Sequence, residues 1–268
     1  MTDKKKAVGI LVVSFGTSYP ETCRKTIEKI EDEIRAACPE HSVYRAWTSG
    51  MIRRKVLKRD GIRIFGVEEA LGQMKADGME EVIVQPTHVI NGIENEEMTK
   101  AVMKFENQFQ SISIGTPLLT TQKDNEEVIK AVLEEMQPSD EELLIFMGHG
   151  TEHHSNAVYA ALNFILKDMG QENVFIATVE AYPSVDHVVK EAAKRNRKKV
   201  RLAPFMLVAG DHANNDLAGE DEDSWKSILE KEGYEVSCDL KGLGEYPGIR
   251  AVYMEHLQEA MKQLSVTK

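Results

Sequence analysis

Strand-like and helix-like segments alternate along almost the whole chain, and this alternation constrains the fold more than any other feature. Residues 8–14 (VGILVVS) form a continuous apolar, β-branched run that stops before Gly16, which is typical of a strand buried on both faces of a sheet. Apolar residues at helical spacing follow, and charged residues fill the opposite face. Strands that alternate with helices form parallel sheets covered by helices on both faces. The predicted fold class is therefore α/β.

Eight strands are predicted, in two groups of four. The first group comprises residues 8–14, 42–47, 81–85 and 111–114, and the second comprises residues 142–147, 174–178, 200–206 and 234–239. Helices are expected between the strands, including 94–108 and 124–136, and a last helix is expected over about 247–266. Each group is predicted to form one doubly wound, four-stranded parallel sheet.

Short sequence matches link the two groups. Phe15-Gly16-Thr17 closes the first strand, and His149-Gly150-Thr151 closes the fifth strand 134 residues later. Pro86 stands six residues before Gly92 and eight before Glu94, as Pro204 stands before Gly210 and His212. We interpret these matches as an internal duplication that gives two similar domains, 1–138 and 139–268, facing a central cleft. The last helix is the one segment expected to be able to pack back on the first domain.

Charge and composition exclude several classes of protein. The 268-residue chain has a net charge of −11, which disfavours binding to nucleic acid or to an anionic membrane surface. It contains no apolar run long enough for a membrane span, and Met1–Lys6 carries no cleavage-site pattern, so a cytoplasmic location is expected. Three cysteines without C-x-x-C spacing fit neither a disulfide framework nor a cysteine zinc site.

Unusual polar residues follow three strands of the second group. His149 lies in FMGHGTEHH, Glu180 in VFIATVEAYP and His212 in VAGDHANND. Because the carboxyl ends of parallel strands meet at one edge of a sheet, we expect these side chains to lie together. Two imidazoles and a carboxylate would form a metal site with coordination positions left open. A ligand or gating role for His153 or His154 is a weaker hypothesis, because exposed histidines are common where a loop meets a helix.

The first group offers further candidates for ligand contact. His88 follows a strand and is expected to face the cleft, as are Arg53 and Arg54, whose guanidinium groups could pair with substrate carboxylates. The alternative for the two arginines is an ordinary charged helix face. No G-x-S-x-G, G-x-x-x-x-G-K-[ST], H-E-x-x-H or G-x-G-x-x-G motif is present, so neither a nucleotide nor an organic cofactor is expected.

Several segments together resemble one protein family over nearly the whole chain. They are VVSFGTSYPETC, RAWTSGMIRRK, HVINGIE, GTPLL, FMGHGTEHH, VEAYP, PFMLVAGDHANNDLAG and GLGEYPGIRA. In this order they are similar to the anaerobic sirohydrochlorin cobaltochelatases of cobalamin biosynthesis, which belong with ferrochelatase to the ATP-independent chelatases. The resemblance implies two α/β domains that hold a planar tetrapyrrole, and a metal bound by two histidines and a glutamate that match His149, Glu180 and His212.

The resemblance also implies an activity and a set of site residues. The expected reaction is ATP-independent insertion of Co²⁺ into sirohydrochlorin or precorrin-2, with His149 and Glu180 as catalytic proton acceptors. Substrate binding is assigned to Ser14, Phe15, Gly16, Thr17, Arg53, Arg54, His88, Asn91, Gly92 and Glu94. The expected partners are the tetrapyrrole and a divalent metal ion. A homo-oligomer is a further possibility that the sequence leaves open. Ni²⁺, Fe²⁺ and Zn²⁺ suit the same ligands, so a sirohydrochlorin ferrochelatase for sirohaem synthesis and a non-catalytic metal or tetrapyrrole carrier are the alternatives.

Overall fold

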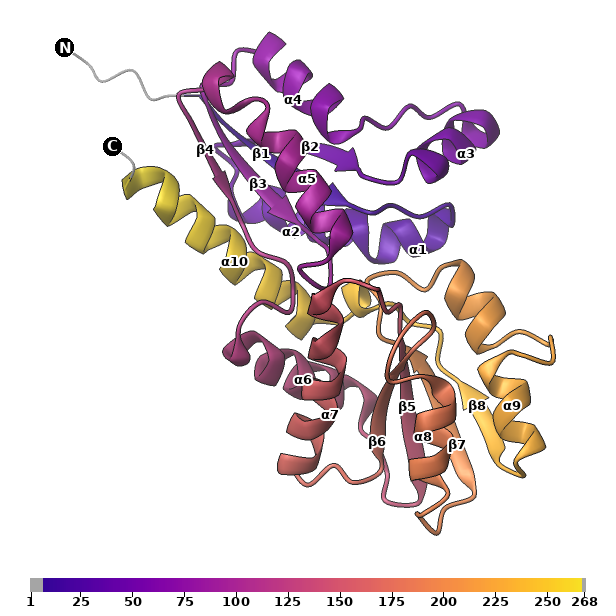
Figure 1. Cartoon of the computed structure of the whole chain (residues 1–268). Helices are drawn as coiled ribbons and strands as arrows, with labels where there is room; N and C mark the ends of the chain where they lie inside the picture. The colour runs from indigo at the N-terminus through magenta and orange to yellow at the C-terminus, as the bar shows by residue number, and fades with distance from the viewer. Residues whose placement is uncertain (1–6, 267–268) are drawn as a thin grey trace. The chain divides into compact units, whose positions relative to one another are not determined.

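The computed structural model describes residues 7–266, so the prediction made on Met1–Lys6 lies outside the described residues. The chain forms two compact units (Figure 1). Unit 1 contains the chain up to Thr120 together with the segment from Arg250 onward, and unit 2 contains Thr121–Ile249. Each unit is built around its own parallel sheet.

Unit 1 holds a four-stranded sheet in the order β2-β1-β3-β4. Its strands are β1 (Val8–Ser14), β2 (Ser42–Trp47), β3 (Glu81–Pro86) and β4 (Ser111–Ile114), and all neighbouring pairs are parallel. Its helices are α1 (Pro20–Lys25), α2 (Ile27–Ala37), α3 (Gly50–Asp60), α4 (Val67–Ala76) and α5 (Ile93–Met103), with a short 3₁₀ turn at Glu106–Gln108. The final helix, α10 (Pro247–Val266), belongs to unit 1 from Arg250 onward.

Unit 2 repeats this topology with a sheet in the order β6-β5-β7-β8. Its strands are β5 (Glu142–Gly148), β6 (Val174–Thr178), β7 (Lys199–Pro204) and β8 (Glu235–Cys238), again all parallel. Its helices are α6 (Gln122–Met136), α7 (Ala157–Asp168), α8 (Val185–Ala192) and α9 (Trp225–Lys231), with short turns at His154–Asn156, Ala213–Leu217 and Leu243–Glu245. The predicted α/β class with two four-stranded parallel sheets is confirmed.

Each core forms where apolar strand residues meet apolar helix faces. In unit 1, Leu11 and Val13 of the central strand pack in one cluster with Leu71 and Met74 of α4. In unit 2, Ile145 of the central strand belongs to a cluster with Trp225 and Leu229 of α9. Burial of one such side chain contributes roughly 1.5–3 kcal/mol, so these strands fix the position of the loops at their ends.

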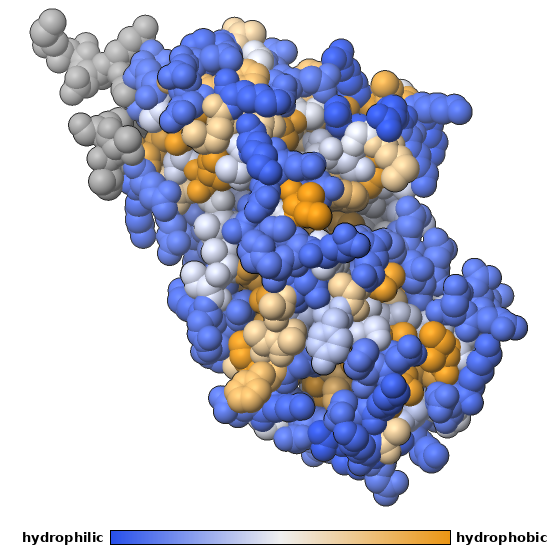
Figure 2. Space-filling view, in the orientation of Figure 1, coloured by the Kyte–Doolittle hydropathy of each residue, from blue (hydrophilic) through white to orange (hydrophobic). Residues whose placement is uncertain are grey.

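The face of the molecule shown in Figure 2 is mostly hydrophilic, and its hydrophobic residues form separate small groups. Among residues 7–266, no helix combines the length and the apolar character that a membrane crossing requires.

Some element boundaries differ from those predicted. The first predicted helix is interrupted at Thr26, whose hydroxyl donates a hydrogen bond of 2.5 Å to the Thr22 carbonyl and competes with the regular helix pattern. The predicted helix 94–108 ends at Met103 and continues only as the 3₁₀ turn. Strand β7 ends at Pro204 rather than Met206, because the chain turns away to form the loop that carries His212.

The division into units also differs from the predicted boundary between residues 138 and 139. Helix α6 belongs to unit 2, where the Tyr246 hydroxyl lies 3.2 Å from the Met136 sulfur. The segment from Arg250 onward belongs to unit 1, where Arg250 Nε pairs with Glu33 of α2 at 2.7 Å. In the same unit the Tyr253 hydroxyl donates to the Thr87 carbonyl at 2.8 Å.

Candidate metal centre

The three predicted metal ligands lie together in unit 2. His149 follows β5, Glu180 follows β6 and His212 lies in the loop after β7. One ligand atom from each lies within 4.8 Å of the others. The side chains of His149 and Glu180 are about half exposed, at 48% and 54%. An ion could therefore reach this group directly from solvent.

His149 and Glu180 are neighbours because the pairing of β5 with β6 continues beyond both strands. Gly148 pairs with Thr178 at the end of the ladder, and the Val179 amide then donates to the Gly148 carbonyl at 3.0 Å. The Glu180 amide donates to the His149 carbonyl at 3.0 Å. The Glu180 carboxylate comes within 3.7 Å of His149 Nδ1. The sheet register itself thus brings the two ligands together.

Gly150 lets the chain turn sharply directly after His149. Its φ of +83° lies in the left-handed region that favours glycine, and an added Cβ would lie 2.8 Å from the Thr178 Cβ. Gly16 has a φ of +100° at the matching place after β1. This shared geometry agrees with the Phe15-Gly16-Thr17 and His149-Gly150-Thr151 matches in the sequence.

His212 reaches the group through a loop that is held by backbone hydrogen bonds. The Leu243 amide donates to the Met206 carbonyl at 2.8 Å, and the Gly244 amide donates to the Leu207 carbonyl at 3.0 Å. The His212 ring then packs edge-on against the His149 ring, with ring centroids 4.8 Å apart and an interplanar angle of 89°.

Hydrogen bonds at Nδ1 select the tautomer of both imidazoles. His149 Nδ1 lies 2.8 Å from the Gly150 carbonyl oxygen, and His212 Nδ1 lies 2.8 Å from Asp216 Oδ2. A carbonyl and a carboxylate only accept, so Nδ1 carries the proton in both neutral rings. In this tautomer the Nε2 atom of each ring carries the free lone pair. The residue-by-residue reading of the sequence missed Asp216, although its position four residues after His212 at the start of a helical turn is a usable signal.

This donor set fits a divalent ion that must later leave the site. Two imidazole nitrogens and one carboxylate suit Co²⁺, Ni²⁺, Fe²⁺ and Zn²⁺. Three protein ligands leave coordination positions free for exchange, which is the pattern of catalytic rather than structural metal sites.

The residues assigned to substrate binding lie in unit 1; apart from Arg53, which is partly exposed, they divide into an exposed and a buried set. Phe15, Arg54, Asn91 and Glu94 are exposed, whereas Ser14, Gly16, Thr17, His88 and Gly92 are buried. Ser14 accepts a hydrogen bond of 2.8 Å from the Thr87 hydroxyl, and the Thr17 hydroxyl accepts one of 3.2 Å from the Tyr19 amide. The hydroxyls of Ser14 and Thr17 are thus engaged within the unit, and the expected contact of the buried set with substrate stays a prediction.

The two arginines of α3 have different surroundings. Arg53 donates to Glu69 at 2.7 Å, and its guanidinium lies so close to Gly66 that an added Cβ there would be 2.9 Å away. Within the described residues, no hydrogen bond or ion pair holds Arg54. Arg54 is therefore the arginine of this pair that is available to an anionic ligand.

Comparison with known proteins identifies the family of the chain. The family described as "Cobalt chelatase (CbiK)" matches residues 8–262. The chain belongs to this cobalt chelatase family. The resemblance inferred from the sequence motifs is confirmed.

Two curated relatives of this cobalt chelatase carry related names. The chain is 41% identical over 259 residues to "Sirohydrochlorin cobaltochelatase" of Salmonella typhimurium, an alignment that covers 96% of this chain and 97% of the relative. It is 32% identical over 260 residues to "Sirohydrochlorin cobaltochelatase CbiKC" of Nitratidesulfovibrio vulgaris, covering 96% and 91%.

Solved structures share the fold of this cobalt chelatase at low sequence identity. SirB from Bacillus subtilis with Fe³⁺ matches with a TM-score of 0.66 and 12% identity, covering 95% of each chain. SirB from Bacillus subtilis subspecies spizizenii in complex with cobalt matches with a TM-score of 0.66 and 13% identity, covering 96% of each chain.

Proposed function

We propose that this cobalt chelatase inserts Co²⁺ into sirohydrochlorin in anaerobic cobalamin biosynthesis, without ATP. The observation that carries the proposal is the His149–Glu180–His212 group in a chain of the cobalt chelatase family. Both curated relatives are named sirohydrochlorin cobaltochelatases. The cytoplasm, predicted from the sequence, is the proposed location.

The reaction exchanges one divalent ion for two protons. The ion is first held by the Nε2 atoms of the two histidines and by the Glu180 carboxylate. The four pyrrole-type nitrogens of the macrocycle then replace these ligands, and the two N–H groups of the macrocycle each lose a proton. The products are the metallated macrocycle and two protons, so the charges on the two sides balance. ATP takes no part in this exchange.

The ligands themselves can receive the protons. As the ion passes to the macrocycle, the His149 Nε2 lone pair becomes free close to the nitrogen that is losing its proton. The Glu180 carboxylate can take the second proton, and while the ion is bound its negative charge lowers the energy of holding a dication. His212 completes the ligand set.

The exposed residues of unit 1 are the proposed contacts with the substrate. Arg54 can pair with the carboxylates at the periphery of the macrocycle, because its guanidinium is free of intramolecular ion pairs in the described chain. Phe15, which is 42% exposed, offers an aromatic face to a planar ring system.

Turnover under anaerobic conditions tests the proposal. Purified protein is mixed with excess Co²⁺ and excess sirohydrochlorin, and the spectral change counts metallated product per protein against the uncatalysed rate. We expect many equivalents from the wild type. Alanine at His149, Glu180 or His212 should lower kcat/KM by more than about 100-fold, beyond the 10–100-fold typical of outer-shell partners of a metal ligand.

His187→Ala is the matched control, because His187 is an exposed histidine of unit 2 on α8, outside the ligand group. Full activity in His149→Ala would refute the mechanism. A burst that stops near one equivalent and leaves the tetrapyrrole bound would identify a carrier instead. In a competition with Co²⁺, Ni²⁺, Fe²⁺ and Zn²⁺ at equal free concentrations, exclusive insertion of iron would identify a ferrochelatase.

A further inference from the structure

The two metal-binding imidazoles are held by different chemical groups. His149 Nδ1 meets the neutral carbonyl of Gly150, whereas His212 Nδ1 meets the carboxylate of Asp216, each at 2.8 Å. Asp216 is itself 46% exposed on its side chain, and its carboxylate lies in the loop rather than in the core. Nothing in the packing of the core therefore accounts for its orientation toward His212.

An unusual backbone turn presents Asp216 to His212. Residues Ala213–Leu217 form a π-helical turn, in which the Ala218 amide donates to the Ala213 carbonyl five residues earlier at 3.3 Å. Such turns are rare and occur often at functional sites. Here the turn begins directly after His212 and contains Asp216, so it sets the geometry of this pair.

Neighbouring residues hold the wide turn in place. At its end, an added Cβ on Gly219 would come within 2.1 Å of the Asn215 carbonyl oxygen, so a side chain would not fit. The buried Ser224 hydroxyl donates to the Gly219 carbonyl at 2.7 Å. The turn is thus fixed from its C-terminal side, and the position of Asp216 follows from the fold of the loop.

A carboxylate on the outer nitrogen of a metal-binding imidazole has two effects. It fixes the tautomer and the plane of the ring, and it stabilises the positive charge that spreads over the ring when the inner nitrogen binds a dication. We propose that Asp216 is a positioning residue of this chelatase, which holds His212 with its Nε2 lone pair directed to the incoming metal ion. The inference rests on the proposed function, in which His212 is a metal ligand.

Two substitutions separate orientation from charge. In Asp216→Asn the amide oxygen can still accept from Nδ1–H, but the negative charge is lost. In Asp216→Ala both the hydrogen-bond acceptor and the negative charge are lost. Asp223→Asn is the matched control. Asp223 is an exposed acid of the same loop, and its substitution removes the same negative charge.

The first measurement uses the metal-free protein, with the histidine rings labelled with ¹⁵N, at about pH 8.5, two units above the ordinary histidine pKa. Ring ¹⁵N shifts report which nitrogen of His212 carries the proton. We expect the Nδ1–H form in the wild type, in Asp216→Asn and in Asp223→Asn, and a mixture of both tautomers in Asp216→Ala.

The second measurement is the affinity of the metal-free protein for Co²⁺, followed by the visible absorption of the bound ion. We expect a loss of about tenfold in Asp216→Asn and up to about 100-fold in Asp216→Ala. Asp223→Asn should stay within about twofold of the wild type. In turnover, KM for sirohydrochlorin should not change, whereas kcat/KM for Co²⁺ should fall with the affinity.

Two outcomes distinguish this inference from the proposed function. If His212→Ala loses Co²⁺ binding while Asp216→Ala keeps both the Nδ1–H tautomer and wild-type affinity, the role of Asp216 is refuted and the ligand set stands. If His212→Ala binds Co²⁺ as the wild type does, the ligand set itself is refuted. Circular dichroism of each variant shows whether the loop change has unfolded the chain.

Discussion

His88 is a titratable side chain enclosed in unit 1. It is only 8% exposed, and within the described residues neither ring nitrogen has a hydrogen-bond partner of good geometry. Burial lowers the pKa of His88 to about 4 from an ordinary value of 6.5, and the nearby Asn95 side chain opposes this shift. His88 is therefore neutral in the folded protein at neutral pH.

This burial predicts a pH dependence of stability. Between pH 6.5 and about 4 the unfolded chain takes up a proton at His88 that the folded chain does not, so the free energy of unfolding falls as the pH is lowered. The full effect is on the order of 3 kcal/mol. Urea denaturation at several pH values should show a flatter profile for His88→Leu than for the wild type. His187→Leu, at an exposed site, should keep the wild-type slope, and equal slopes in all three proteins would contradict the prediction.

Individual residues differ in how far the sequence could place them. His149, Glu180 and His212 were predictable because each follows a strand of one parallel sheet, and strand ends of such a sheet share an edge. The burial of Ser14, Thr17 and His88 was not predictable, because it depends on contacts between segments far apart in the sequence. At His88, for example, the Tyr253 hydroxyl of α10 donates to the carbonyls of Thr87 and His88.

Strands and helices were predictable to different degrees. The strands at 8–14, 42–47, 111–114 and 174–178 have the predicted bounds, because a continuous apolar or alternating run starts and stops clearly in the sequence. The break at Thr26 and the π-helical turn at Ala213–Leu217 were not predicted. Both depend on local backbone geometry and side-chain hydrogen bonds that periodicity does not encode.

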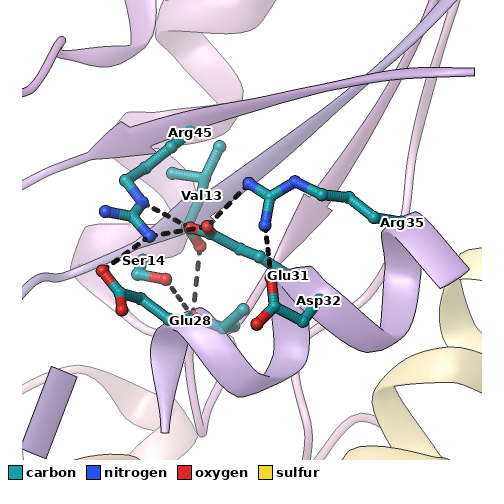
Figure 3. A network of polar contacts seen from close by, with 8 residues as sticks. Val13, Ser14, Glu28, Glu31, Asp32, Arg35 and Arg45 are labelled. Carbon is teal, nitrogen blue, oxygen red and sulfur yellow. Dashed lines mark hydrogen bonds and ion pairs between the residues drawn. The ribbon is translucent and has the colours of Figure 1, made fainter. Parts of the chain in front are cut away.

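Helix α2 is joined to β2 by a charged network around Glu31, which is fully buried. Figure 3 shows Arg45 and Arg35 approaching its carboxylate from opposite sides. Arg45 donates two bonds to it, of 2.6 and 2.7 Å, and Arg35 donates one of 3.1 Å. All of the ion pairs of Arg45 thus run between β2 and α2.

Removal of this carboxylate should cost stability. Glu31→Ala leaves Arg45, whose side chain is 27% exposed, without its main partner, and we expect the free energy of unfolding to fall by about 3 kcal/mol. Asp32→Ala on the same helix removes only a more exposed pair with Arg35 and should cost less than about 1 kcal/mol. Urea denaturation of the two variants measures the difference. A similar loss of unfolding free energy in both variants would show that the buried ion pair stabilises the fold no more than the exposed one.

At the scale of the whole molecule, the sequence predicted two similar α/β units but not their limits. The predicted boundary, between residues 138 and 139, fell in the loop before β5, where the second group of strands begins. Helix α6 nevertheless belongs with the following sheet, because Tyr246 and Gly248 contact it near Met136 and Ala131. Contacts of this kind join segments that are distant in the sequence, so no local sequence pattern predicts them.

All three proposed metal ligands lie within unit 2, which is one continuous segment, and this allows a test by fragmentation. The fragment 121–249 contains unit 2 with its complete sheet and core. We expect it to fold and to bind Co²⁺ with a dissociation constant within about tenfold of that of the full chain, a difference of 1.4 kcal/mol. Titration with Co²⁺ measures this, and the same fragment with His212→Ala is the control. A folded fragment that fails to bind the ion would contradict the assignment of a self-contained site.

The passage of α10 into unit 1 has a consequence for how the protein is made. Most domains near an N-terminus can fold while the ribosome is still adding later residues. Unit 1 cannot be completed in this way, because Tyr253 and Leu257 are synthesised after the whole of unit 2. At about 5–20 residues per second, the delay is on the order of ten seconds. During that time the nascent N-terminal half exposes the apolar surface that Tyr253 and Leu257 later cover.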